Sequence, residues 1–507
     1  MPDMPEINLT SIANSVLWGT FLVTILLGIV LQKTRFCTMG AITDIMIMGE
    51  WTRMRQWMMA IGVALIGVGI MSSSGIIDPA KSIYTSSRLT WLSTIVGSVM
   101  FGFGMVLASG CGSKTLVRMG SGSLKALVVF MVLGLSSYMT LKGIFGVLRV
   151  NTTDTVFVTL STNQDLPSIF AASLGMTKAS LQLMLSLVIG GVLIAFALAK
   201  KNFWTFNNLL AGFGVGSAIL AIWWISGVMG YVAEDPNTLE EVFVATNSGR
   251  MESLTYVAPY AYVIEWLTFY SDASKKITLG IASVGGLVLG STAYALFTKT
   301  FYWESFRDAE DTGNHIIGAI LMGIGGVTAF GCTIGQGLTG MSTLAINSFI
   351  AFAGYVVGAM LAMKYLTWRM LPPPCEPVVA GGNSNYHSNT GGCGMPLQIA
   401  CHTDQFGTLG QITPDDVAQI ARQGYKSIIN NRPDGEGGPA QALNAEIEMA
   451  AKALGLQYAY LPVVSGQITL EQAQEMARLL EEMPGPVLAF CRSGARSTNL
   501  YMLAQQV

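Results

Sequence analysis

The chain has 507 residues, of which 51% are hydrophobic and only 11% are charged. Soluble proteins usually carry about 25% charged residues, so this composition excludes an ordinary soluble globular protein. The net charge of −2 provides no basic surplus, and we expect no nucleic acid as a partner. The seven cysteines are an odd number, which excludes complete intramolecular disulfide pairing.

Nine apolar runs are each long enough to cross a lipid bilayer as a helix, which takes roughly 20 residues. Residues 1–14 contain no Lys or Arg, so the first run lacks the basic region of a signal peptide and is interpreted as a retained span. The chain is therefore predicted to be a polytopic α-helical membrane protein with about nine spans. The runs lie near residues 15–32, 56–76, 91–109, 124–148, 171–199, 207–231, 276–298, 313–331 and 345–368.

The distribution of positive charge predicts how the chain is oriented. Lys and Arg accumulate in short loops on the cytoplasmic side of a membrane. Segment 33–55 holds four of them, whereas the N-terminus before the first run holds only acids. We therefore expect the N-terminus outside a bacterial inner membrane and segment 33–55 in the cytoplasm. After nine crossings, the chain beyond Arg369 is also expected in the cytoplasm.

Two Gly-rich segments of the membrane part, 97–111 and 318–332, align without a gap. Five crossings separate them, an odd number, so they are predicted to run in opposite directions. Inverted repeats with Gly-interrupted segments are the usual architecture of transporters. The repeat predicts a conduit along which Cys111 and Cys332 lie; the alternative is that each is a small buried hydrophobe at a helix end. The identical pairs are Gly97/Gly318, Gly102/Gly323, Gly104/Gly325, Val106/Val327, Ala108/Ala329, Gly110/Gly331 and Cys111/Cys332.

A third cysteine, Cys37, is predicted at the cytoplasmic end of the first span, beside Arg35. Nearby cations favour a thiolate or an anion that passes it. Lys114 and Arg118 follow Cys111 and are candidates for attracting an anion at the cytoplasmic mouth. They are equally well explained as positive anchors on that side of the membrane.

Three short motifs surround these cysteines: Arg35-Phe-Cys37-Thr-Met-Gly-Ala, Gly110-Cys111-Gly and Gly331-Cys332-Thr-Ile-Gly-Gln. They resemble the YeeE/YedE family of sulfur-compound transporters, which includes bacterial thiosulfate importers, over roughly residues 15–370. The resemblance implies that the three cysteines relay thiosulfate through an hourglass-shaped pore. Selenium species, sulfite, sulfide or persulfide remain alternative cargoes.

From Leu371 the composition changes to Gly, Asn, Ser and Pro, which is typical of an extended linker. We predict a membrane transporter domain at 1–371, a flexible linker at 372–402 and a cytoplasmic domain at 403–507. The linker contains no compact Cys-x2-Cys pair, and we expect no metal site and no cofactor. No role follows for its three cysteines, Cys375, Cys393 and Cys401.

Residues 403–507 alternate strands and helices, which predicts an α/β domain with a parallel sheet. Thr413-Pro414 and Thr469 are residue types that begin helices. An apolar strand at 486–490 ends at Cys491, which places this cysteine on a loop before the last helix. The other predicted elements are strands at 425–430 and 458–462 and helices at 414–423, 439–454 and 470–482.

A cysteine on such a loop is in an activating position. Backbone N–H groups of the loop and the helix N-terminus favour negative charge on the sulfur, and they also bind oxyanions. Arg492 and Arg496 add positive charge to this field. Cys491, Arg492 and Arg496 are therefore the candidate catalytic residues.

The spacing of Cys491 and Arg496 distinguishes two chemistries. Cysteine phosphatases use Cys-x5-Arg, whereas this loop is Cys-x4-Arg and resembles the loop of rhodanese-type sulfurtransferases. The motifs Ile429-Asn-Asn-Arg432-Pro-Asp434-Gly-Glu and Cys491-Arg-Ser-Gly-Ala-Arg-Ser are similar to those of the beta-lactamase-hydrolase-like family, whose sequence is phosphatase-like overall. Arg432 and Asp434 are interpreted either as an anion-binding and acid pair or as part of a Pro-Asp-Gly turn.

Two hypotheses follow. In the first, a thiosulfate importer is fused to the enzyme that uses its cargo. The anion passes Cys332, Cys111 and Cys37, Cys491 takes the outer sulfur as a persulfide, and a small cytoplasmic sulfur-carrier protein is a possible partner. In the second, the chain is a membrane-anchored cysteine phosphatase whose spans only localise it.

Overall fold

The computed structural model describes residues 8–235, 239–306, 308–370, 397, 399–438, 441–464 and 468–505. The chain divides into two compact units, Met1–Tyr365 and Leu366–Val507. Of the predicted linker 372–402, only Leu397 and residues 399–402 are described, and Cys375 and Cys393 lie outside the described residues. The folded second unit already has a strand at Ala400, ahead of the predicted boundary at residue 403.

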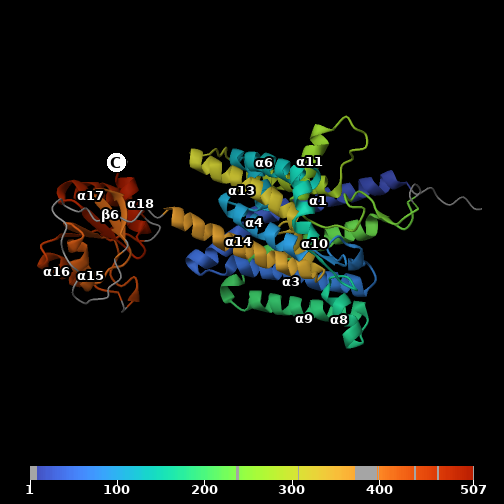
Figure 1. Ribbon diagram of the computed structural model, residues 1–507, viewed down its shortest axis with the longest axis horizontal. Helices are drawn as coiled ribbons and strands as arrows, with labels where there is room; N and C mark the ends of the chain where they lie inside the picture. The colour runs from blue at the N-terminus through green and yellow to red at the C-terminus, as the bar shows by residue number, and fades with distance from the viewer. Residues whose placement is uncertain are drawn as a thin grey trace, which may run out of the picture. The chain divides into compact units, whose positions relative to one another are not determined.

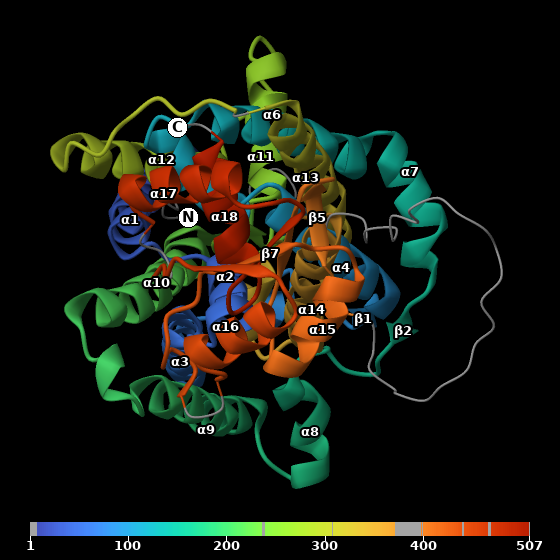
Figure 2. The ribbon, with the colours of Figure 1, turned by 90° about the vertical axis from the view of Figure 1, so that its left-hand side faces the viewer.

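Long, apolar helices dominate the first unit and run roughly side by side (Figure 1). Viewed nearly along their axes, they form a bundle in which α9 lies at the edge beside α3 (Figure 2). The long helices are α1 (Leu9–Thr34), α3 (Thr52–Ser73), α4 (Trp91–Leu107), α6 (Leu124–Lys142), α9 (Lys178–Leu198), α10 (Phe206–Trp224), α12 (Leu279–Phe297), α13 (Ala309–Thr328) and α14 (Ile346–Met370).

Eight helical segments among the described residues are long and apolar enough to cross a membrane. They correspond to eight of the nine predicted runs. The remaining run, 313–331, forms α13, which packs against α4 and α6. This helix carries Glu310, Asp311 and His315 in its first half. The chain is therefore a polytopic helical membrane protein, as its composition predicted.

Short elements connect and interrupt the long helices. They include three π-helical segments, η1, η5 and η6, and two short antiparallel strand pairs, β1–β2 and β3–β4. Their bounds are α2 (Thr38–Thr43), η1 (Asp44–Met48), η2 (Pro79–Lys81), β1 (Arg88–Leu89), α5 (Gly112–Gly120), α7 (Ile144–Asn151), η3 (Thr153–Thr155), β2 (Val158–Thr159), α8 (Leu166–Leu174), η4 (Lys201–Phe203), η5 (Ile225–Met229), β3 (Tyr231–Val232), β4 (Val242–Phe243), α11 (Ala258–Thr268) and η6 (Gly335–Gly340).

The two similar Gly-rich segments form helices α4 and α13, and these pack directly against each other. A Cβ atom on Gly97 would lie 2.6 Å from the Gly325 carbonyl oxygen, and one on Gly104 would lie 2.6 Å from the Gly318 oxygen. The early part of α4 thus contacts the late part of α13, and the two helices are antiparallel. Small residues let membrane helices approach this closely, because their association depends on packing rather than on hydrophobic burial.

The second unit contains a five-stranded sheet in the order β5-β6-β9-β7-β8. β6, β9, β7 and β8 are parallel, as predicted, and β5 adds an antiparallel edge. The hairpin of β5 and β6 was not anticipated from the sequence. The elements are β5 (Ala400–Thr403), β6 (Phe406–Leu409), α15 (Pro414–Arg422), β7 (Ser427–Asn430), α16 (Asn444–Ala453), β8 (Gln457–Tyr460), α17 (Leu470–Glu482), β9 (Val487–Phe490) and α18 (Ala495–Ala504).

Alternating side chains of the central strands bury both faces of this sheet. Ile428 and Leu488 pack into a core with α15 and α16, whereas Ile429 and Ala489 pack into a second core with α17 and α18. A parallel sheet is normally covered on both faces in this way. Because β9 is central, its C-terminal end delivers Cys491 to the middle of the sheet edge.

Candidate functional site

Each membrane cysteine follows a break between two helical segments. Two residues before each cysteine, the backbone has a positive φ: 53° at Arg35, 54° at Ser109 and 59° at Phe330. A left-handed residue other than glycine costs about 1–2 kcal/mol, so such a conformation persists only where the surrounding structure imposes it. After the break, Cys37 begins α2, Cys111 begins α5 and Cys332 precedes η6.

The breaks before Cys111 and Cys332 share their hydrogen bonds as well as their sequence. Gly110 donates its backbone N–H to the Met105 oxygen at 2.8 Å, and Gly331 donates to the Gly326 oxygen at 2.9 Å. These donors and acceptors occupy equivalent positions in the aligned segments. The two similar sequences therefore end their helices in the same local structure.

The structure brings together the three cysteines that the sequence singled out. The side chains of Cys37 and Cys111 lie near enough to each other to interact. Cys332 lies near enough to Cys111 for an electrostatic interaction. The exposed fractions are 7% for Cys37, 1% for Cys111 and 0% for Cys332, so the thiols form a buried group.

Polar groups surround these sulfur atoms. The N–H of Gly40 donates to Cys37 Sγ at 3.4 Å. Cys332 Sγ accepts from the N–H groups of Gly335 and Tyr256, both at 3.4 Å. Cys111 Sγ lies 3.4 Å from the Ser113 hydroxyl oxygen. Donors that point at a buried site favour negative charge there.

Two cavities lie at opposite ends of α4. The first, of about 590 Å³, is lined by Thr90 just before α4 and by Phe330 just after α13. The second, of about 740 Å³, is lined by Ser109 just after α4 and by Glu304 shortly before α13. We call them the Arg88 cavity and the Cys37 cavity, after a residue that lines each. A helix of 17 residues spans roughly 26 Å, which approaches the thickness of a bilayer core.

The Cys37 cavity is rich in positive charge. All three residues predicted to attract an anion at this end, Arg35, Lys114 and Arg118, line it. The guanidinium of Arg118 also donates to the Ser109 oxygen at 3.1 Å. The acids in the lining are fewer than the cations. The lining cations are Lys33, Arg35, Arg53, Lys114 and Arg118, and the lining acids are Asp44 and Glu304.

The Arg88 cavity also contains cations, which sequence reasoning missed. Arg149 Nε lies 3.0 Å from a carboxylate oxygen of Asp154, and Arg88 donates to the Asp154 backbone oxygen at 2.8 Å. Gln336 lines the cavity and donates its backbone N–H to the Cys332 oxygen at 2.8 Å. The cavity thus reaches to within one helical turn of Cys332.

In the second unit, Cys491 lies directly after β9 and is 1% exposed. Its N–H donates to the Leu409 oxygen of β6 at 3.3 Å, which holds the start of the loop against the sheet. Gly494, with a φ of 86°, turns the chain into α18. The side chain of Arg492 is exposed, so it is less constrained than that of Arg496.

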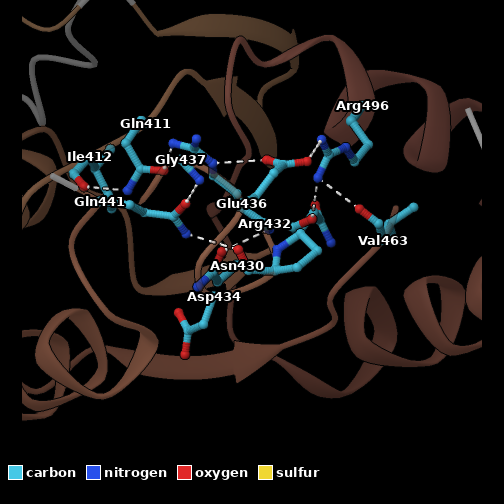
Figure 3. Close-up of polar contacts among 12 residues, drawn as sticks. Gln411, Ile412, Asn430, Arg432, Asp434, Glu436, Gly437, Gln441, Val463 and Arg496 are labelled. Carbon is cyan, nitrogen blue, oxygen red and sulfur yellow. Dashed lines mark hydrogen bonds and ion pairs between the residues drawn. The ribbon is translucent and has the colours of Figure 1, made fainter. Parts of the chain in front are cut away.

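Arg496 and Arg432 meet at a carboxylate that sequence reasoning did not select, Glu436 (Figure 3). Arg496 donates to one Glu436 oxygen at 2.5 Å, and Arg432 donates to the other at 2.9 Å. Arg496 also donates to the Val463 oxygen at 2.7 Å. Partial burial raises the pKa of Glu436, but the hydrogen bonds from Arg496 and Arg432 outweigh it and leave that pKa below its usual value.

Asp434 lies apart from this group. Its carboxylate accepts the N–H of Asn444 at 2.8 Å, at the beginning of α16, and points away from Arg432 in Figure 3. Arg432 therefore forms its ion pair with Glu436. Through this hydrogen bond Asp434 ties the Pro-Asp-Gly turn to the start of α16, as the turn interpretation predicts. Its role as an acid in catalysis stays a prediction.

The bundle, its buried cysteines and the appended sheet define a helical membrane transporter with a C-terminal α/β domain. Comparison with known proteins identifies the family. A sequence profile described as "Sulphur transport" matches residues 33–361, and the chain belongs to this family. A second profile, "Beta-lactamase hydrolase-like protein, phosphatase-like domain", matches residues 398–507.

Individual relatives agree with both matches. The chain is 26% identical to "Thiosulfate transporter TsuA" of Spirochaeta thermophila over 346 residues. The aligned region covers 68% of this chain and 96% of that relative. The chain is also 26% identical over 342 residues to the protein of the same name in Escherichia coli, covering 66% and 91%. The C-terminal part is 37% identical over 111 residues to "Beta-lactamase hydrolase-like protein" of Xylella fastidiosa, covering 22% of this chain and 26% of that relative.

Proposed function

We propose that the chain imports thiosulfate across a bacterial inner membrane and passes its outer sulfur to Cys491. The observation that carries this proposal is the buried group of Cys332, Cys111 and Cys37 between two cation-lined cavities. The relatives named as thiosulfate transporters support this choice of cargo.

The chemistry of the cysteine group suits a sulfur anion. A doubly charged anion is costly inside a bilayer unless donors compensate its lost hydration. Thiol groups are weak hydrogen-bond donors, and the terminal sulfur of thiosulfate is a softer acceptor than the oxygens of sulfate. The N–H groups around the sulfurs and the cations of both cavities supply the remaining compensation. Arg35, Lys114 and Arg118 would attract the anion at the Cys37 cavity.

The positive-inside rule sets the proposed direction. The Cys37 cavity carries five cations, so it faces the cytoplasm in our proposal, and the N-terminus lies outside. Packing of α4 against α13 in opposite directions supports an inverted repeat with the path at its interface. We assign 1–371 to transport and 403–507 to a cytoplasmic enzyme domain, joined by 372–402.

In the second domain, the Cys491 thiolate attacks the outer sulfur of thiosulfate. A sulfur–sulfur bond forms at Cys491, the sulfur–sulfur bond of thiosulfate breaks, and its electron pair leaves with sulfite. Arg496 and the loop N–H groups hold the anion during this step. The loop of six residues from Cys491 to Arg496 supports sulfur transfer over phosphoryl transfer. A small cytoplasmic sulfur-carrier protein would then collect the persulfide.

Uptake of radiolabelled thiosulfate into proteoliposomes tests the transport step. We expect the wild type and a chain ending at Arg369 to take it up, and the variant Cys111→Ala/Cys332→Ala to lose uptake. Sulfite, sulfide and selenium species serve as competing cargoes. Undiminished uptake by the double variant would contradict the path.

The enzyme step is tested separately by offering the full chain thiosulfate with cyanide, or p-nitrophenyl phosphate. We expect thiocyanate from the wild type and none from Cys491→Ser. Release of phosphate without thiocyanate would favour the phosphatase alternative, which the profile of the C-terminal domain keeps open.

A further inference from the structure

Two threonines that directly follow cysteines of the path have buried hydroxyl groups with no hydrogen-bond partner among the described residues. They are Thr38, which is 2% exposed, and Thr333, which is 0% exposed. Both belong to the same pattern, Cys37-Thr-Met-Gly40 and Cys332-Thr-Ile-Gly335. In both, the glycine N–H donates to the cysteine sulfur at 3.4 Å.

Several other buried threonines of the bundle satisfy their hydroxyls within their own helix, although the Thr20 hydroxyl in α1 also lacks a partner among the described residues. Thr24 donates to the Thr20 oxygen at 2.8 Å, and Thr140 donates to the Ser136 oxygen at 2.7 Å. Thr38 and Thr333 cannot donate to a carbonyl one turn earlier in the same way, because the helix is interrupted just before each neighbouring cysteine. A buried donor without a partner is destabilising, so these positions call for a functional explanation.

Thr333 is placed where a cargo on the cysteine path would meet it. It is the chain neighbour of Cys332, and its side chain also lies near enough to the Cys111 thiol to interact with it. A hydroxyl near these thiols offers a strong donor beside two weak ones.

We propose that the Thr333 hydroxyl, and by the same pattern that of Thr38, binds the oxygen atoms of the anion while the neighbouring thiols contact its terminal sulfur. This inference rests on the proposed function. Thiosulfate has one sulfur end and one sulfonate end, and a hydroxyl gives a charge-assisted hydrogen bond to anionic oxygen. Thiols alone would not distinguish thiosulfate from hydrosulfide, which has no oxygen. Each Cys-Thr pair therefore binds both the sulfur end and the sulfonate end of thiosulfate.

The test measures thiosulfate uptake by full-length protein in proteoliposomes for Thr333→Val, Thr333→Ser and Thr38→Val. Thr140→Val is the matched control, since it removes a buried hydroxyl that already has a partner. We expect the KM for thiosulfate to rise roughly tenfold in Thr333→Val, as for one lost hydrogen bond to an anion, and to recover in Thr333→Ser. Inhibition of uptake by hydrosulfide should keep the same inhibition constant in Thr333→Val.

The outcomes separate this inference from the proposed function. Absence of thiosulfate uptake by the wild type would overturn the proposed function. Uptake by the wild type with equal KM values for Thr333→Val and Thr140→Val would overturn the role of Thr333 alone. If Thr333→Val does not yield folded protein, Thr38→Val decides, because the same rise in KM is expected there.

Discussion

Gly104 and Gly318 approach each other so closely that a Cβ atom added to either would lie 2.6 Å from the carbonyl oxygen of the other. Gly97 and Gly325 show the same reciprocal approach, also at 2.6 Å. The alignment that relates the two segments exchanges these pairs, since Gly97 matches Gly318 and Gly104 matches Gly325. If each residue is replaced by its aligned partner in the other helix, one of the two glycine contacts becomes the other. The contact between α4 and α13 is therefore symmetric under exchange of the two helices.

This contact predicts a penalty for adding even one methyl group. Gly104→Ala would place its Cβ against the Gly318 oxygen, 2.6 Å away, and against backbone that has no room to move. We expect a loss of about 1–3 kcal/mol in stability, which is the usual cost of overpacking. Thermal unfolding in detergent measures it. Gly191→Ala in α9 is the control, because nothing lies within 4 Å of its added Cβ, and an unchanged melting temperature in both variants would contradict the packing.

The cations of the Cys37 cavity should act on the anion at a distance. We expect Lys114→Gln to lower the rate of thiosulfate uptake at low salt and to have a smaller effect at high salt, because salt screens charges beyond roughly 10 Å at 0.1 M. Uptake is measured across a series of ionic strengths with osmolarity held constant. Lys276→Gln, at the opposite end of α12 from this cavity, should leave the salt dependence unchanged. A parallel loss at all salt concentrations would contradict the electrostatic role.

Arg496 should be needed for sulfur transfer in a way that lysine cannot replace. Its guanidinium reaches Val463, Asn431 and Glu436 together, and a lysine ammonium lacks that fork. We expect Arg496→Lys to reduce thiocyanate formation by roughly a hundredfold, since removal of one oxyanion donor costs about that much. Arg478→Lys is the control, because Arg478 is exposed and pairs with Glu475 and Glu482 of its own helix; this variant should be indistinguishable from the wild type.

The ion pairs of Glu436 predict how the C-terminal domain responds to acid. The hydrogen bonds from Arg496 and Arg432 hold the pKa of Glu436 below its usual value in the folded state. Stability from these pairs is therefore fully present above the ordinary glutamate pKa and is lost as the pH falls through the lowered one. Hydrogen exchange of amides around Glu436 should speed up on acidification. Glu436→Gln should remove much of this pH dependence; an equal acid response in that variant would show that other carboxylates cause it.

The sequence predicted the membrane helices, the alternating C-terminal elements and the cysteines that the structure brings together. Apolar length and strand–helix alternation are local signals, and an aligned Gly-Cys motif is a strong one. Thr413 and Thr469 also begin α15 and α17 as predicted. These features could be predicted because each depends on residues close together in the chain.

Other features depend on contacts that no local pattern records. Arg88 and Arg149 come together through Asp154 although 60 residues separate them, so neither stood out as a cavity residue. Glu436 did not stand out because no local pattern shows that the turn directs its carboxylate, rather than that of Asp434, towards the arginines. The hydroxyls of Thr38 and Thr333 lack a hydrogen-bond partner because of their folded surroundings, which no local sequence pattern records.

The central claim is that an intact sulfur anion crosses the membrane along the buried cysteines. Thiosulfate labelled separately at its outer and inner sulfur would be presented to proteoliposomes that contain the wild type or Cys111→Ala/Cys332→Ala. Our account predicts that both labels enter at the same initial rate with the wild type and that neither enters with the double variant. Entry of the outer label alone, or unchanged entry of both through the double variant, would contradict it.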